Sequence, residues 1–177
     1  MDRMDAERLL REYADGRRDF SGLDLSRLHL FEVNLQDADL RGCDLTGAYL
    51  PYARMDRVNL QGVQLKDADL SHARLQAVSL AQANLQGANL SRALLVQADL
   101  NGADLSESLC QATDFQFANL QHADFTGATL SYAKLDAADL TSACLKRCNL
   151  FRSQGGDFEQ SICDRTTIFP DGHRLDK

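Results

Sequence analysis

Residues 83–105 read ANLQGANLSRALLVQADLNGADL, and in this stretch an apolar side chain returns at every fifth position. The same spacing continues in both directions, without interruption, from Leu25 to Leu150. Nearly all of these positions hold Leu, and the exceptions are Met55, Cys110, Phe115 and Phe125. Two residues before most of them stands a small residue, usually Ala, and the residue between is most often Asp or Asn. The repeating unit is therefore A-[D/N]-L-x-x.

A period of five fits neither an amphipathic helix, whose apolar residues return after three or four positions, nor a longer strand, which alternates. Within one unit, however, the small residue and the Leu lie two positions apart. Both therefore point inward from a very short extended segment, and the Asp or Asn between them points outward. The last two residues are polar and often include Gly, as in Thr46-Gly47 and Gln86-Gly87, which indicates a turn. Each inward Leu contributes about 1.5–3 kcal/mol of burial free energy.

This unit resembles that of the pentapeptide-repeat family, and the likeness covers nearly the whole chain. In that family, four units make one coil of a right-handed quadrilateral β-helix. The resemblance thus implies an all-β solenoid, and residues 21–150 would form a rod roughly 30 Å long at about 4.8 Å per coil.

Four units per coil place residues that are twenty apart on the same face of the rod. We number the faces by their first inward Leu: face 1 begins at Leu25, face 2 at Leu30, face 3 at Leu35 and face 4 at Leu40. Faces 1 and 4 are expected to carry most of the outward acid, for example Asp24, Asp44, Asp104 and Asp124 on face 1. We expect these carboxylates to bond nearby backbone groups, as Asp and Asn do in turns.

The two ends depart from the repeat, so we divide the chain into an N-terminal helical cap (1–19), the pentapeptide-repeat β-helix (20–150) and a frame-shifted last coil with a C-terminal cap (151–177). The cap helix is predicted over Asp5 to Asp15, with Leu9, Leu10 and Tyr13 on one side and Gly16 as its stop. It should fold over the first coil near Phe20. After Leu150 the spacing slips, and it is expected to resume at Phe158, Cys163 and Ile168.

Charge and composition exclude several classes of protein. A formal charge of −7 and a pI near 5.0 argue against direct nucleic-acid binding, which needs clustered Lys and Arg. The N-terminus has no apolar segment typical of a secretory signal, and no unbroken apolar run is long enough to cross a membrane. The 5 cysteines, an odd number without a C-x-x-C pair, fit reduced thiols. We therefore expect a cytoplasmic protein without membrane contact.

No catalytic, cofactor-binding or metal-binding constellation is apparent, and we expect no enzyme activity and no cofactor. Cys144 is predicted to point outward and Cys148 inward, so the two could not share a metal ion. No phosphate-binding loop, nucleophile elbow or H-E-x-x-H motif occurs. The histidines fall at outward or tail positions on different parts of the rod, where we expect them to be solvated: His29, His72, His122 and His173.

Apolar and basic side chains at outward positions of two faces form the candidate interaction surface, because clusters of exposed apolar residues often mark binding sites. Face 3 carries Arg54, Arg57, Arg74, Leu94, Val96 and Phe117, and face 2 carries Phe31, Tyr49, Tyr52, Leu109 and Tyr132, with Pro51 and Phe151 beside them.

Two functions fit these features. The first is a protein–protein interaction scaffold or regulatory module, whose partner is an unidentified protein or a second copy of the chain in a homodimer. The second is implied by the resemblance: some pentapeptide-repeat proteins are acidic dimers that mimic DNA and protect DNA gyrase from quinolones. Against the second reading, Gln64 and Asn84 interrupt the acidic row of face 1, and face 3 carries arginines.

Overall fold

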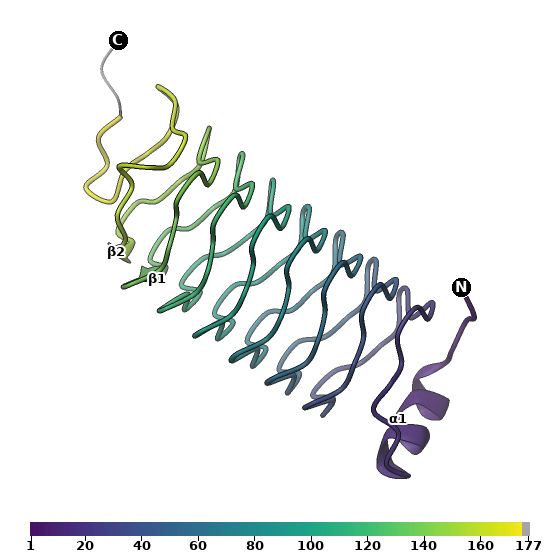
Figure 1. Cartoon of the computed structure of the whole chain (residues 1–177). Coiled ribbons are helices and arrows are strands. Elements are labelled where there is room, and N and C mark those ends of the chain that lie inside the picture. Colours follow the sequence, from purple (N-terminus) through teal and green to yellow (C-terminus); the bar gives the residue numbers. More distant parts are fainter. Residues whose placement is uncertain (175–177) are drawn as a thin grey trace.

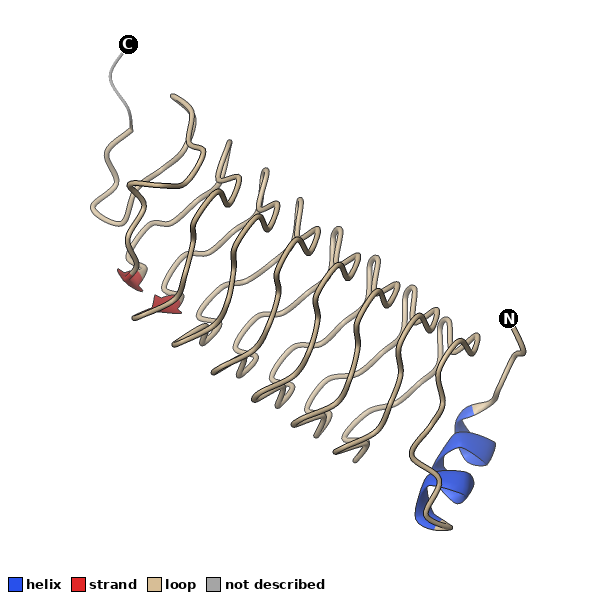
Figure 2. Ribbon diagram, viewed as in Figure 1, coloured by secondary structure: helices blue, strands red, loops and turns tan. Residues whose placement is uncertain are grey.

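The protein is a solenoid of stacked coils, described by a computed structural model over residues 1–174 (Figure 1). The assigned elements are a helix, α1 (Ala6–Ala14), and two short strands, β1 (Lys134–Leu135) and β2 (Gln154–Gly155), which pair in parallel. Elsewhere the coils are joined by single parallel bridges, which in the regular part of the chain join residues twenty apart, such as Asp24 with Asp44 and Asn59 with Ser79. Each side of a coil holds one such bridge between two turns, which explains why most of the chain is drawn as loop in Figure 2. The predicted twenty-residue register is confirmed.

The interior consists of columns of Leu flanked by Ala. Leu60, Leu80 and Leu100 are fully buried in successive coils. The Ala residues two positions before the central side chains are buried as well. Phe115 and Phe125 are also fully buried, with ring centroids 6.1 Å apart in an edge-to-face arrangement. Cys110 lies in the same coil as Phe115, and its small side chain offsets the volume that the two rings add.

The backbone of a regular unit pairs almost completely with the coils on either side. Leu45 donates its N–H to the carbonyl of Gln64 in the next coil at 2.7 Å, and Asp44 donates to Leu23 in the preceding coil at 3.0 Å. The N–H of the first turn residue, Thr46, has no such carbonyl and is accepted instead by Asp44 Oδ1 at 2.9 Å. The outward Asp and Asn residues thus close turns, as expected from the sequence.

The second turn residue of each unit adopts a left-handed backbone conformation. Gly47 and Gly62 have φ of 64° and 65°, but Tyr52, Arg57 and Phe117 lie at 59–60° as well. A non-glycine residue is strained there by roughly 1–2 kcal/mol. The strain persists because the neighbouring coils fix the turn from both sides.

The N-terminal end is closed partly by α1 and partly by residues 2–4. Asp5 caps the helix by accepting the N–H of Arg8 at 2.7 Å, and Leu9 is fully buried against the first coil. Arg3 forms a parallel bridge with Asp24, which places Met4, only 3% exposed, in the core below face 1. The expectation that Leu10 would share the buried side of the helix is wrong. Leu10 is 43% exposed, because only one side of so short a helix contacts the coil.

The C-terminal end is closed by aromatic side chains. Phe158 and Phe169 meet edge to face at 6.1 Å, and Phe158 packs on the buried core. Ile168 does not point inward as the sequence register suggested. It pairs with Asn149, an outward position, and the inward neighbour is the buried Thr167, which donates to the carbonyl of Leu145 at 2.8 Å. The turn that begins at Asp164 holds one residue more than the repeat allows, and this extra residue shifts the register.

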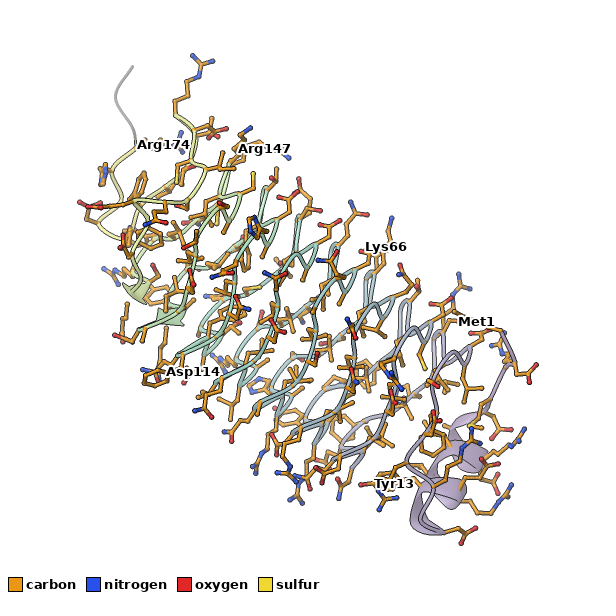
Figure 3. All side chains as sticks on the ribbon, in the orientation of Figure 1. Met1, Tyr13, Lys66, Asp114, Arg147 and Arg174 are labelled. Carbon is orange, nitrogen blue, oxygen red and sulfur yellow. The ribbon has the colours of Figure 1, made fainter. Side chains whose placement is uncertain are left out.

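Figure 3 shows how the faces separate the side chains: Lys66 and Arg147, which follow the face 1 residues Leu65 and Leu145, project from one edge, and Asp114 of face 3 from the opposite side. Among residues 1–174, no helix combines the length and the apolar composition that a membrane span requires.

Candidate binding surfaces

Aromatic rings gather on face 2 near the N-terminal end. We call the following five rings the aromatic patch: His29, Phe31, Tyr49, Tyr52 and His72. The solenoid register brings them together, because His29 is the bridge partner of Tyr49 one coil later and Tyr52 lies twenty residues before His72. The patch therefore spans three coils on one side of a rigid rod.

The rings of the aromatic patch form a continuous chain of contacts. His29 lies 4.5 Å from Tyr49 between ring centroids, and Phe31 is stacked on Tyr49 at 6.2 Å. Phe31 also meets Tyr52 edge to face at 5.9 Å, and Tyr52 stacks on His72 at 4.6 Å. Such pairs contribute about 0.5–1.5 kcal/mol each beyond burial. The rings therefore hold one another in place before any partner arrives.

The patch remains open to solvent although its rings are in contact. Phe31 is 46% exposed, Tyr49 38% and Tyr52 49%. Tyr49 occupies an outward position that usually holds Asp or Asn, so it cannot accept the N–H two residues later. Pro51 stands at that place and has no N–H to satisfy, which makes the aromatic substitution compatible with the turn.

Two histidines were missed in the sequence interpretation. His29 and His72 were expected to be solvated on different parts of the rod, and the structure places each of them against a tyrosine of the aromatic patch, tilted for His29 and stacked for His72. The signal that could have found them is the twenty-residue register, which places position 29 beside 49 and position 72 beside 52.

The other residues predicted on face 2 form a separate cluster near the C-terminal end. The guanidinium of Arg152 lies over the rings of Phe151 and Tyr132, at 5.1 and 5.8 Å, and donates to the Tyr132 hydroxyl at 3.2 Å. Leu109 is exposed on the coil before Tyr132. Face 2 thus carries two apolar areas, separated by the outward positions Asp69 and Asn89.

On face 3 the predicted arginines are largely neutralised. Arg57 forms an ion pair with Asp37 of the preceding coil at 2.7 Å. Arg74 lies 3.2 Å from Asp56, a buried carboxylate that also accepts the N–H of Gln76 at 3.1 Å. Arg54 is exposed and forms no ion pair within residues 1–174. Face 3 therefore presents one unpaired guanidinium among the three.

The apolar residues predicted on face 3 are less exposed than those of the aromatic patch. Leu94 and Val96 are half-buried, and Phe117, on the next coil, is 60% exposed. No aromatic partner lies against Phe117 in the described part of the chain. It is a single exposed ring, not part of a cluster of rings.

The acidic residues of faces 1 and 4 also serve the turns. The hydroxyl and the N–H of Ser26 hold the pKa of Asp24 below its usual range, and Thr141 does the same for the pKa of Asp139. Asn119 of face 4 donates to Asp99 at 2.9 Å, which separates the acids of that face. On face 1, Asp104 and Asp124 are direct bridge partners. Since Asn could close these turns equally well, the charge of face 1 is not required by the fold.

Buried thiols of the core are not reactive groups. Burial raises the pKa of Cys110 to about 12, and burial also raises the pKa of Cys43 and Cys148. A thiol that stays protonated at neutral pH is a poor nucleophile. Within residues 1–174, no group of three His, Cys, Asp or Glu side chains could hold a metal ion.

Comparison with known proteins finds one family. The family model described as pentapeptide repeats matches residues 17–47, 38–76, 73–109 and 108–147, with 8 copies. No curated protein matches the sequence.

Among solved structures, HetL, a pentapeptide-repeat protein involved in heterocyst differentiation regulation in the cyanobacterium Nostoc sp. strain PCC 7120, is 29% identical over 97% of this chain and 100% of its own, with a TM-score of 0.30. A pentapeptide-repeat protein of the Arabidopsis thaliana thylakoid lumen is 28% identical over 64% of this chain and 69% of its own, with a TM-score of 0.29. QnrB1, a plasmid-mediated fluoroquinolone resistance protein, is 16% identical over 92% of this chain and 89% of its own, with a TM-score of 0.44.

Proposed function

Because the chain belongs to the pentapeptide-repeat family, whose members are generally non-catalytic, we propose that it is a binding scaffold that holds a protein partner on the aromatic patch. On the same basis we assign its coils the right-handed quadrilateral winding of that family. The observation that supports the scaffold is the chain of contacts from His29 to His72 on the outside of a rigid core.

The aromatic patch has the properties of an interface centre. Tyrosine is enriched at the residues that dominate binding energy, because a Tyr ring buries a large area with few rotatable bonds. The rings of Phe31, Tyr49 and Tyr52 are already ordered by their mutual contacts, so a partner would lose little side-chain entropy there. The solenoid core makes the surface rigid.

Site-specific photo-crosslinking in the native host tests this proposal. A benzophenone amino acid at Tyr52 should crosslink to one protein partner, and the same group at Phe117 on face 3 should not. The two positions are matched, because both hold exposed aromatic residues with φ of 59° and 60°. The partner should then lose at least tenfold in affinity for a Phe31→Ser, Tyr52→Ser variant in a purified binding assay. Crosslinks that form only from Phe117 would move the interface to face 3.

A second copy of the chain is one form that the partner could take. Sedimentation equilibrium of the purified protein tests this case. If the parent chain is a dimer and the Phe31→Ser, Tyr52→Ser variant is a monomer, the aromatic patch is a homodimer interface. A monomer at all concentrations leaves a different protein as the partner.

The alternative function, DNA mimicry toward DNA gyrase, has support from face 1, where Asp24 with Asp44 and Asp104 with Asp124 form adjacent charged pairs. The test is gyrase supercoiling in the presence of a quinolone. Asp104→Asn together with Asp124→Asn is the decisive variant, because Asn keeps the oxygen that closes each turn and removes only the charge. Protection by the parent chain that this variant loses would favour mimicry. If the parent chain at micromolar concentration did not protect gyrase from the quinolone, DNA mimicry would be excluded.

A further inference from the structure

A notch opens on face 4 at the C-terminal end, where one side of the last coil is missing. On a regular side, the next coil accepts two N–H groups and supplies one to a carbonyl. One coil earlier on face 4, Leu120 donates to Asp139 at 2.9 Å, His122 donates to Thr141 at 3.0 Å, and Asp139 donates to the carbonyl of Ala118 at 3.0 Å.

The coil that contains Leu140 has lost most of this pairing. After β2 the chain makes its insertion and returns only at Gln160, which accepts the N–H of Ser142 at 2.9 Å. In residues 1–174, no backbone partner pairs with the N–H groups of Ala137 and Leu140 or with the carbonyl of Ala138. Asp139 forms a bridge with Asn119 on its inner side, and the described residues form none with it on its outer side. Three backbone groups thus face outward along the rod without a partner.

A cavity of about 260 Å³ lies above these groups. The apolar part of its lining is Ala137, Ala138 and Leu140, and Ala138, at 9% exposed, is open compared with the fully buried Ala133 and Ala143. The polar part of its lining comprises Asp139, Thr141, Asp157 and Gln160.

The polar wall of the notch is negatively charged. Hydrogen bonds from Thr141 and Gln121 hold the pKa of Asp139 below its usual range, so this carboxylate is ionised at neutral pH. Asp157 is exposed, and its Oδ1 accepts the N–H of Glu159 at 2.9 Å. A ligand of this wall should therefore carry a positive charge.

We propose that the notch binds an extended segment of a partner protein with the order small, basic, apolar, and that this segment supplies the missing side of the coil. The segment would pair its backbone with Leu140 and Ala138, as an added strand does at a sheet edge. Its apolar residue would cover Leu140, and its basic residue would lie over Asp139. This site is separate from the aromatic patch and goes beyond the function proposed for it.

The protein itself shows that a basic residue fits over an outward carboxylate. Lys134 lies one coil above Asp114, its bridge partner, with Nζ 3.4 Å from Oδ2. Lys134 also belongs to the triplet Ala133-Lys134-Leu135, which has the order small, basic, apolar. The proposed segment copies this triplet onto a side of the rod where residues 1–174 do not provide one.

The probe for the test is the peptide acetyl-Gly-Gly-Ala-Lys-Leu-amide, titrated into the ¹⁵N-labelled full chain and followed by NMR. We expect shifts confined to the amides of Ala137 to Thr141 and the side-chain amide of Gln160, with a dissociation constant of about 1 mM because few groups take part. The amide of Leu140 should exchange with solvent much faster than that of Leu120 in the free protein and slow down when the peptide binds.

Two matched peptides and one variant decide the outcome. Replacement of Lys by Asp in the peptide, or methylation of its Lys backbone nitrogen, should abolish the shifts. Asp139→Asn keeps the oxygen that accepts from Thr141 and should weaken binding about two- to fivefold, the effect of an exposed ion pair. Equal binding of the Asp peptide, shifts spread over other faces, or slow exchange of Leu140 in the free protein would each overturn the proposal. Phe31→Ser, Tyr52→Ser should bind the peptide unchanged, which separates this site from the aromatic patch.

Discussion

The two ends of the solenoid differ in how they cover the core and pair the backbone of the terminal coil. At the N-terminal end, residues 2–4 pair with the first coil as a short strand, and α1 covers the remaining core with Leu9. At the C-terminal end, Phe158 and Phe169 cover the core with their rings, but one side of the coil keeps only the backbone hydrogen bond from Ser142 to Gln160 within residues 1–174. Closure by backbone pairing satisfies the edge, whereas closure by side chains covers the core and leaves hydrogen-bonding groups available.

The largest expected effect is at the N-terminal end. Leu9→Ala should lower the free energy of unfolding by about 2–5 kcal/mol, because Leu9 is fully buried and its loss leaves a cavity beneath α1. Urea unfolding measured by circular dichroism gives the value. The matched control is Leu10→Ala, which removes an exposed side chain from the same helix and should change stability by less than about 0.5 kcal/mol. Equal losses for both variants would mean that α1 does not close this end.

The next effect tests the C-terminal end. Gly155→Ala should cost about 1–3 kcal/mol, because Gly155 has φ of 67° and a Cβ there would lie 2.7 Å from the backbone of Asp136. Gly62→Ala is the control for the backbone term, since Gly62 has φ of 65° and open space around it. Hydrogen exchange should show the loss in the last coil and not near Leu25. If both variants lose the same free energy, the contact with Asp136 contributes nothing.

A smaller change at the N-terminal end separates the helix from the strand that precedes it. Asp5→Ala should cost about 1 kcal/mol, because it removes the acceptor for the N–H of Arg8 at the start of α1. Asp5→Ser restores an acceptor and should recover most of the loss. Thermal unfolding of the three proteins measures the difference. A full loss with Ser would indicate that the charge of Asp5, and not its hydrogen bond, stabilises this end.

The sequence was sufficient to predict the structure of the repeating part of the molecule, because the same local constraints apply to each unit. The inward Leu column, the buried Ala and the turn-closing Asp all follow from spacing and residue type, and the structure confirms them. Met4 could not be placed, since a single apolar residue before a helix has no repeat to define its register. The irregular spacing after Leu150 predicted that the repeat register shifts there, but not where the chain runs next. The notch could therefore be found only in the three-dimensional structure.

The candidate surface was partly visible in the sequence. The exposed aromatic residues of face 2 were predicted as a candidate interaction surface, but the contacts among Phe31, Tyr49 and Tyr52 required side-chain orientations that spacing does not give. The same holds for face 3. The ion pairs of Arg57 with Asp37 and of Arg74 with Asp56 depend on how long side chains cross between coils, and within residues 1–174 they leave Arg54 as the unpaired arginine of the three.

The smallest effect concerns the turn that shifts the register near the C-terminus. Hydrogen bonds from Thr166, with further ones from Arg147 and Thr167, hold the pKa of Asp164 at about 2. A carboxylate whose pKa is lower in the folded state than in the unfolded chain stabilises the fold above the unfolded pKa near 4, and this contribution is lost as the pH falls toward 2. Asp164→Asn keeps an oxygen for the N–H groups but cannot titrate, so the last coil of this variant should respond less than the parent between pH 4 and 2. Hydrogen exchange of residues 145–168 across that range measures the response, with Asp5→Asn at the other end as the control. If the last coil of Asp164→Asn responded to pH as strongly as that of the parent, the shifted turn would not depend on the charge of Asp164.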